Sequence, residues 1–184
     1  MLPELIGVLG TILGTVLGWS LNMLSQKGKL HIYTSEWRDR FQANQDGEMV
    51  DVASREDAEE YSYNLDLDIY NSSSETKIMR DVNLEFMASS QIILTDRPKD
   101  DSTRRISGFV SFYDNLEILN IAPKTVMSVH LHGGYWKQDS KDFDKLFQAE
   151  MVLLTFRDQN NKVRTFEISG ASPKSFFEDS NVSI

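Results

Sequence analysis

The sequence predicts an all-β fold in which a single N-terminal transmembrane helix precedes an immunoglobulin-like two-sheet β-sandwich. The first observation behind this prediction is an uncharged run from Leu5 to Leu24, which has the length of roughly 20 residues that spans a bilayer core as a helix. The second is a strict alternation of apolar and polar residues further along the chain, typical of half-buried strands. The third is a series of turn sequences between short strands, an arrangement typical of β-sandwiches.

One face of the N-terminal run collects small and polar residues. A helix turns by about 100° per residue, and on that wheel one arc contains Glu4, Gly7, Gly10, Thr11, Gly14, Thr15, Gly18 and Asn22. Small residues at this spacing let helix backbones approach closely in lipid. We therefore expect this arc either to pack tightly against other helices or to line a narrow, weakly polar pore in a ring of identical helices.

The basic residues near this run predict its orientation. Lys27, Lys29, Arg38 and Arg40 all follow the run, and no Lys or Arg precedes it. Because basic residues stay on the cytoplasmic side, the N-terminus is expected outside and the C-terminal domain in the cytoplasm, as in a single-pass protein of the bacterial inner membrane. A secretory signal is disfavoured because its N-terminal region would be positive.

The composition limits what the rest of the chain can do. We divide the chain into a helix at 1–26, a cytosolic β-sandwich at 27–170 and a flexible tail at 171–184. The whole chain has a net charge of −9, and Glu4 is the one charge among residues 1–25, so the remainder carries −8. Such a domain is repelled by double-stranded DNA unless a local basic patch intervenes. The chain has no cysteine, which excludes disulfides and thiolate chemistry.

Alternation and turn residues predict the individual strands. The clearest segment is 61–69, in which the apolar positions are Tyr61, Tyr63, Leu65, Leu67 and Ile69. A second strand has Val82, Leu84 and Phe86 facing inward, and further strands are expected at 30–37, 116–121, 126–131, 151–157 and 163–168. Hairpin turns are expected at Asp46-Gly47 and at 158–161. Short helical segments are expected at 54–60 and 140–147.

A charged loop at 95–108 holds the densest basic cluster of the chain. Its basic residues are Arg97, Lys99, Arg104 and Arg105, and aromatic residues follow at 109–113. Arginines beside aromatic rings are typical of sites for single-stranded nucleic acid or nucleotides. Aspartates at 96, 100 and 101 are interleaved with the basic residues, and a solvated, mobile loop is the alternative.

Signals for catalysis are weak, and we do not expect an enzyme. His130 and His132 lie on one face of a strand, which could form half of a zinc site, but the spacing supplies no third ligand. The sequence has no nucleophile elbow, no phosphate-binding loop and no dinucleotide fingerprint. We therefore predict no catalytic residue, no metal site and no cofactor.

The order of a glycine-rich span, a Lys-Gly-Lys exit at 27–29 and a cytosolic sandwich resembles small bacterial membrane effectors of anti-phage defence. It is similar in architecture to the Hailong effector, a ligand-gated membrane channel paired with a nucleotidyltransferase. The resemblance implies a homo-oligomeric channel that depolarises the membrane when its sandwich senses an oligonucleotide or nucleotide signal made by an operon partner. The alternative is a membrane-anchored adaptor whose sandwich binds another protein.

Overall fold

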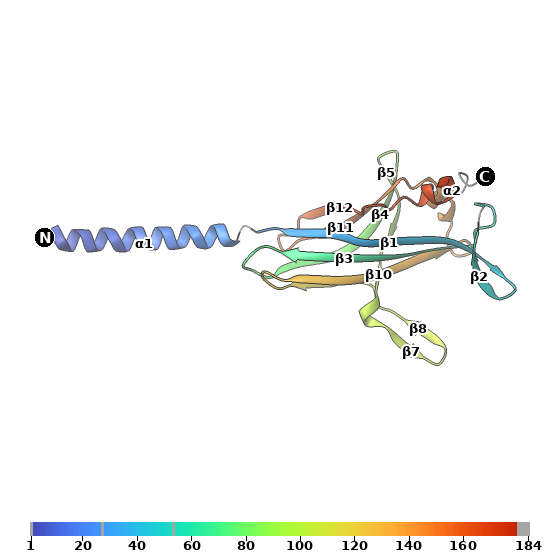
Figure 1. The fold of residues 1–184 in the computed structure, drawn as a ribbon, viewed down its shortest axis with the longest axis horizontal. Coiled ribbons are helices and arrows are strands. Elements are labelled where there is room, and N and C mark those ends of the chain that lie inside the picture. The colour runs from blue at the N-terminus through green and yellow to red at the C-terminus, as the bar shows by residue number, and fades with distance from the viewer. Residues whose placement is uncertain (1, 27, 53, 180–184) are drawn as a thin grey trace.

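A computed structural model describes residues 2–26, 28–52 and 54–179, and it shows a β-sandwich behind a long N-terminal helix (Figure 1). The helix, α1 (Leu2–Gln26), extends away from the sandwich. Among the residues that the structure describes, no helix is long and apolar enough to qualify as a membrane span. The helix itself was predicted from the sequence, whereas its membrane-spanning role is not supported by the structure and stays a prediction.

The first sheet is built around the strand that the sequence predicts most clearly. Its strand order is β2-β1-β3-β10-β6, and the pairs between neighbours are antiparallel. The strands are β1 (Leu30–Gln45), β2 (Glu48–Asp51), β3 (Glu60–Asn71), β6 (Lys99–Asp100) and β10 (Val126–Trp136). β1 turns into β2 through Asp46-Gly47, with Gln45 opposite Glu48, so the predicted hairpin is confirmed.

The second sheet packs face to face with the first. Its order is β12-β11-β4-β5, with β9 also paired to β4. The strands are β4 (Lys77–Ala88), β5 (Gln91–Asp96), β9 (Ile118–Ile121), β11 (Met151–Arg157) and β12 (Val163–Glu167). The predicted hairpin at 158–161 joins β11 to β12, as their antiparallel pairing shows.

The core lies between the inward faces that alternation predicts. Tyr61, Tyr63, Leu65, Leu67 and Ile69 of β3 are at most 2% exposed, as are Val82, Leu84 and Phe86 of β4. Because side chains of a strand alternate between its faces, Asp66 and Asp68 lie on the outer face of the first sheet. Burial of this many large side chains is the main stabilising contribution of the sandwich.

The short helical segments differ in part from the predictions. Residues 54–57 form a turn, in which the Ser54 hydroxyl accepts a hydrogen bond from the Glu56 amide, and no helix forms there. The segment predicted at 140–147 is a 3₁₀ helix, η2 (Phe143–Gln148), which buries Phe143, Leu146 and Phe147. Its inward face is therefore as predicted, although its hydrogen-bonding pattern is not that of an α-helix.

The segment from 171 differs from the prediction of a flexible tail. It forms a 3₁₀ helix, η3 (Pro173–Ser175), and a short α-helix, α2 (Phe176–Asp179), and Phe177 is only 6% exposed. The ring of Phe177 lies 5.0 Å from that of Phe41 and 5.7 Å from that of Phe147. Aromatic burial therefore holds residues 171–179 against the sandwich, whereas residues 180–184 of the predicted tail lie outside the described residues.

Hydrogen bonds hold the segment that follows α1, residues 28–29, against the loop after β3. The Lys29 amide donates to the Ser72 hydroxyl at 2.9 Å, and the Ser72 amide donates to the Lys29 carbonyl at 3.0 Å. A Cβ at Gly28 would lie 2.4 Å from the Cα of Ser73, so only glycine fits this approach. The loop itself is organised by the buried Asn71, whose amide group donates to three backbone carbonyls.

Candidate functional site

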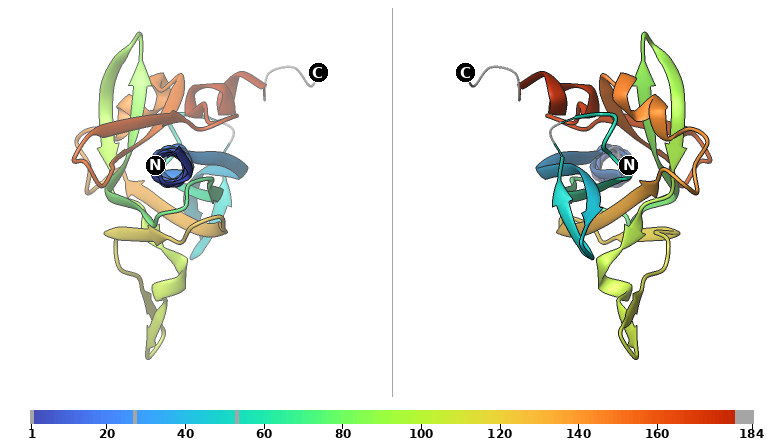
Figure 2. Two further views of the ribbon diagram at one scale, coloured as in Figure 1. Left: turned by 90° about the vertical axis from the view of Figure 1, so that its left-hand side faces the viewer. Right: turned by 90° about the vertical axis from the view of Figure 1, so that its right-hand side faces the viewer.

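A hairpin that we call the finger projects sideways from the sandwich, in a segment where the sequence predicted a mobile charged loop. It consists of β7 (Arg105–Ser107) and β8 (Val110–Phe112) (Figures 1 and 2). Arg105 pairs with Phe112 and Ser107 with Val110, so Gly108 and Phe109 form a two-residue turn. Gly108 has a φ of +63°, which tight hairpin turns require at this position. The prediction of an unstructured loop at 95–108 is therefore wrong.

The tip of the finger carries apolar side chains that no part of the described chain covers. Phe109 is fully exposed, and the other large apolar side chains of the finger are half or more exposed: Ile106, Val110 and Phe112. The pairing places Val110 and Phe112 on one face of the hairpin and Ile106 on the other, with Phe109 at the turn. Single exposed apolar residues are common on protein surfaces, but several on one protruding element favour an interaction site.

The base of the finger is tied together by hydrogen bonds. The Ser102 amide donates to the carboxylate of Asp100 at 2.8 Å, which caps the short 3₁₀ helix η1 (Asp101–Thr103). The Asp114 amide donates to the Thr103 hydroxyl at 2.8 Å, and the Arg105 guanidinium forms an ion pair with the Asp114 carboxylate. These contacts fix the direction of the hairpin, because they join the chain entering the finger to the chain leaving it.

The base is also joined to the first sheet through a histidine. Backbone pairing places Lys99 of β6 opposite His132 of β10. Nδ1 of His132 bonds to the carboxylate of Asp101, and its ring lies 4.3 Å from that of Tyr113 in an edge-to-face arrangement. The neighbouring His130 pairs with Asp66 at 2.8 Å, and the hydrogen bond to that carboxylate raises the pKa of His130 above its ordinary value. Within the described residues no group of His, Asp and Glu could hold a metal ion.

The four basic residues predicted to bind a ligand do not converge on one site. Arg105 is neutralised by Asp114, and Arg104 donates to the hydroxyl of Ser111 at 3.3 Å across the finger. Lys99 lies in the pairing of β6 with β10, and Arg97 is exposed in the link between β5 and β6. The structure therefore uses Arg104 and Arg105 to brace the finger and does not gather the cluster into a phosphate-binding patch.

The sequence analysis named the aromatic residues at 109–113 but missed the hairpin that presents them, although a signal for it was present. Ile106, Val110 and Phe112 flank a Ser-Gly pair, which is a turn signal between two short β-forming stretches. Charged residues on both sides of this segment made the apolar–polar alternation of its two short strands hard to recognise, so the hairpin was not predicted.

The predicted residues of the N-terminal helix lie along α1 without contact to the sandwich. Thr11, Thr15 and Asn22 are exposed, and a Cβ at Gly7, Gly10, Gly14 or Gly18 would meet nothing within 4 Å. The Thr11 hydroxyl donates to the Gly7 carbonyl at 3.0 Å and the Thr15 hydroxyl to the Thr11 carbonyl at 2.9 Å. The side chain of Glu4 lies outside the described residues. In this single chain, the glycine face is open to a partner.

Comparison with known proteins supports the immunoglobulin-like sandwich. The model of the YopI Ig-like domain matches residues 28–169. The SPbeta prophage-derived uncharacterized protein YopI of Bacillus subtilis is 22% identical over 160 residues, which cover 85% of this chain and 89% of that protein.

Two solved structures resemble the chain more distantly. The putative ApaA protein of Bordetella pertussis has a TM-score of 0.37 at 9% identity, covering 77% of this chain and 89% of that one. An uncharacterized β-sandwich protein of Clostridium difficile has a TM-score of 0.33 at 11% identity, covering 78% of this chain and 91% of that one. At this similarity neither structure bears on function.

Proposed function

The chain belongs to the YopI Ig-like domain family, and on this scaffold we propose a membrane-anchored binding protein. In this proposal α1 tethers the protein to the bacterial inner membrane, and the cytoplasmic sandwich presents the finger to a partner protein. The single observation that carries the proposal is the exposed apolar tip of the finger on a hydrogen-bonded base.

The tether rests on the apolar character of α1. No helix among the described residues qualifies as a membrane span, so the tether rests on the sequence, in which the run from Leu5 to Leu24 carries no charge. Ile12, Leu13 and Leu17 are more than half exposed. A continuous apolar surface on a protruding helix requires a cover, and lipid provides one that agrees with the basic residues on its C-terminal side.

The binding role rests on the shape and chemistry of the finger. Aromatic and branched side chains that enter a pocket of the partner supply most of the energy at protein interfaces. Phe109 stands at the turn, and Val110 and Phe112 share one face of the hairpin behind it. Because the base is braced by Asp100 and Asp114, little conformational entropy is lost when the tip docks. The finger is therefore suited to an apolar groove on another protein.

A homo-oligomeric channel in anti-phage defence, which depolarises the membrane, is the competing function. For conduction, the polar side chains on the glycine face of α1 would have to contact water when the helices of the ring separate. The hydroxyl protons of Thr11 and Thr15 are already donated to carbonyls of their own helix, so the face can pack without leaving an unpaired donor. This observation favours packing of α1 over conduction through it.

Photo-crosslinking at the finger tests the proposed function. A photoreactive phenylalanine analogue at Phe109 should give one discrete adduct with another protein in the bacterial host. The same analogue at the exposed Tyr33 on β1 serves as the control and should not give this adduct.

A Phe109→Ser variant with the analogue at Val110 should lose the adduct while the protein remains folded. Equal adducts from positions 109 and 33 would contradict the binding role. Current from the purified chain in planar bilayers, abolished by valine at Thr11 and Thr15, would establish the channel instead. A reporter fused after Ile184 that is active only on the outer side of the membrane would overturn the proposed topology.

A further inference from the structure

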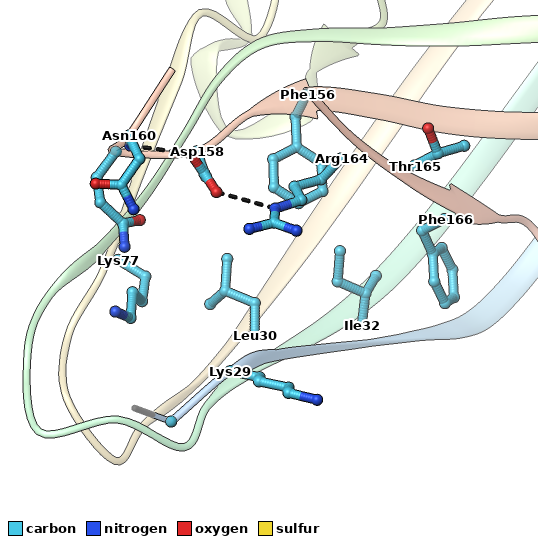
Figure 3. A pocket seen from close by; sticks show the side chains of 12 residues that line it. Lys29, Leu30, Ile32, Lys77, Phe156, Asp158, Asn160, Arg164, Thr165 and Phe166 are labelled. Atoms are coloured by element: carbon cyan, nitrogen blue, oxygen red, sulfur yellow. Dashed lines mark hydrogen bonds and ion pairs between the residues drawn. The ribbon is translucent and has the colours of Figure 1, made fainter. Parts of the chain in front are cut away.

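A cleft of about 510 Å³ opens between the two sheets, at the end of the sandwich that adjoins α1 (Figure 3). Its volume lies within the range of roughly 300–1,000 Å³ that is typical of small-molecule sites. One wall comes from the first residues of β1 and the other from β11, β12 and the turn between them. None of the residues that the sequence analysis selected for ligand binding lines this cleft.

The inner surface of the cleft is apolar. Leu30 and Ile32 point from β1 toward the opposite sheet, where Phe156 and Phe166 lie (Figure 3). Phe156 is 5% exposed, whereas Leu30, Ile32 and Phe166 keep part of their surface open to the cleft. An apolar surface between two sheets that the sandwich does not close over favours a hydrocarbon guest.

Lys77 contributes an ammonium group to this apolar cleft. The Lys77 residue is 9% exposed, its Nζ keeps access to solvent, and its side chain makes no hydrogen bond or ion pair within the described part of the chain. Lys77 shares the inward face of β4 with Met79, because side chains two positions apart lie on one face of a strand. An ammonium group that no described side chain neutralises attracts an anion into the cleft.

A guanidinium group also lines the cleft: Arg164 lies on β12, in the same sheet as Lys77 on β4, with β11 between the two strands. Nε of Arg164 donates to Oδ2 of Asp158 at 2.9 Å, while its terminal nitrogens point into the cleft (Figure 3). Oδ1 of Asp158 accepts the amides of Asn160 at 2.9 Å and Lys162 at 3.0 Å. Asp158 is therefore occupied by its own turn and by an ion pair with Arg164, which keeps an exposed guanidinium edge, so Asp158 does not neutralise Lys77.

The charge of the cleft is opposite to that of the domain. Its lining contains the basic residues Lys29, Lys77 and Arg164 and one acid, Asp158, in a chain whose net charge is −9. Lys29 stands at the rim, next to the exit of α1 (Figure 3). A local excess of positive charge within an acidic protein selects anions at this one place.

We propose that the cleft binds an anionic amphiphile, a molecule with one carboxylate or phosphate head and a hydrocarbon chain. The head lies between Lys77 and Arg164, where an ammonium and a free guanidinium edge form charge-assisted hydrogen bonds. The chain lies against Leu30, Ile32 and Phe166. This site stands on the geometry of the sandwich alone and does not depend on the finger or on the tether.

Binding of matched twelve-carbon probes tests this site. The full-length protein is titrated calorimetrically in solution with dodecanoate and dodecanol, and the same injections into buffer without protein give the background. Dodecanoate should bind at least tenfold more tightly than dodecanol. Lys77→Met should abolish this preference, whereas Lys141→Met, at an exposed lysine remote from the cleft, should retain it. Lysophosphatidate, a single-chain phospholipid, is titrated in the same way. Tighter binding of lysophosphatidate than of dodecanoate would indicate a lipid headgroup as the ligand, and weaker binding would indicate a free fatty acid.

Stability separates a binding role of Lys77 from a structural one. A ligand-binding Lys77 predicts that Lys77→Met melts at the same temperature as the wild type or higher, because the substitution breaks no hydrogen bond or ion pair of the described residues. Lower melting together with unchanged dodecanoate binding would overturn the proposal, as would equal binding of dodecanoate and dodecanol by the wild type.

A second variant tests the surface proposed to bind the hydrocarbon chain of the ligand and leaves the basic residues of the cleft unchanged. Ile32→Trp fills the inner surface and should weaken dodecanoate and dodecanol by a similar factor of at least ten. If inorganic phosphate binds as tightly as dodecyl phosphate, the cleft is a simple anion site and the amphiphile proposal is wrong.

Discussion

Replacing Asn71 by leucine tests how the exit of α1 is held to the sandwich. Asn71 is fully buried at the end of β3. Its Nδ2 donates to the carbonyls of Glu75, Ile121 and Ala122 at 2.7, 2.9 and 3.1 Å. Its Oδ1 accepts the Ser73 amide at 2.9 Å. Leucine has a similar volume but can form none of these bonds.

The expected loss follows from the groups that are left without partners. The Ile121 carbonyl and the Ser73 amide belong to residues that are fully buried, and each unsatisfied buried group costs about 1–3 kcal/mol. The carbonyls of Glu75 and Ala122 belong to exposed residues and can be hydrated. We expect the free energy of unfolding to fall by about 3 kcal/mol, which lowers the melting temperature by roughly 6–12 °C for a domain of this size.

Urea unfolding of the full-length chain, followed by tryptophan fluorescence, measures this loss. Ser72→Ala is the control, because its hydroxyl bonds to Lys29 at an exposed position and should cost less than about 1 kcal/mol. A loss below about 1 kcal/mol in Asn71→Leu would show that the loop does not depend on this side chain.

Three further predictions concern charge, backbone approach and self-association. In an NMR titration, the midpoint of His130 should lie above 6.5 and should fall in Asp66→Asn, because the Asp66 carboxylate favours the protonated ring. Gly28→Ala should destabilise the protein by about 1–3 kcal/mol in urea unfolding, because its Cβ would meet the Ser73 backbone. Gly14→Leu should weaken any oligomer seen by crosslinking in detergent, since a side chain there separates helix backbones.

Each of these predictions has a control and a contrary result. The His130–Asp66 pair should stabilise the fold below pH 6.5, and its contribution should be lost as the pH rises through the raised pKa of His130 in the folded state. An unchanged His130 midpoint in Asp66→Asn would show that Asp66 does not raise this pKa. Gly10→Ala, where a Cβ meets nothing, should leave unfolding unchanged, unlike Gly28→Ala. Leu13→Ile should keep the oligomer, and an intact oligomer in Gly14→Leu would mean that the packing face is misassigned.

The sequence by itself determined the sandwich and the inward faces of its central strands. Alternation reports which side of a strand is buried, and this information is local, so Tyr63 and Leu84 could be assigned to the core without knowing their neighbours. The Asp46-Gly47 hairpin was predictable for the same reason, because a turn depends on the residues within it.

The tertiary structure alone decided which distant residues meet. Lys77 begins β4 and Arg164 lies in β12, and only the packing of the sheet edge against β1 places both in one cleft. Phe177 docks because Phe41 and Phe147 form a surface that no local pattern describes. Such contacts join residues far apart in sequence, and their energy depends on the geometry of the whole fold.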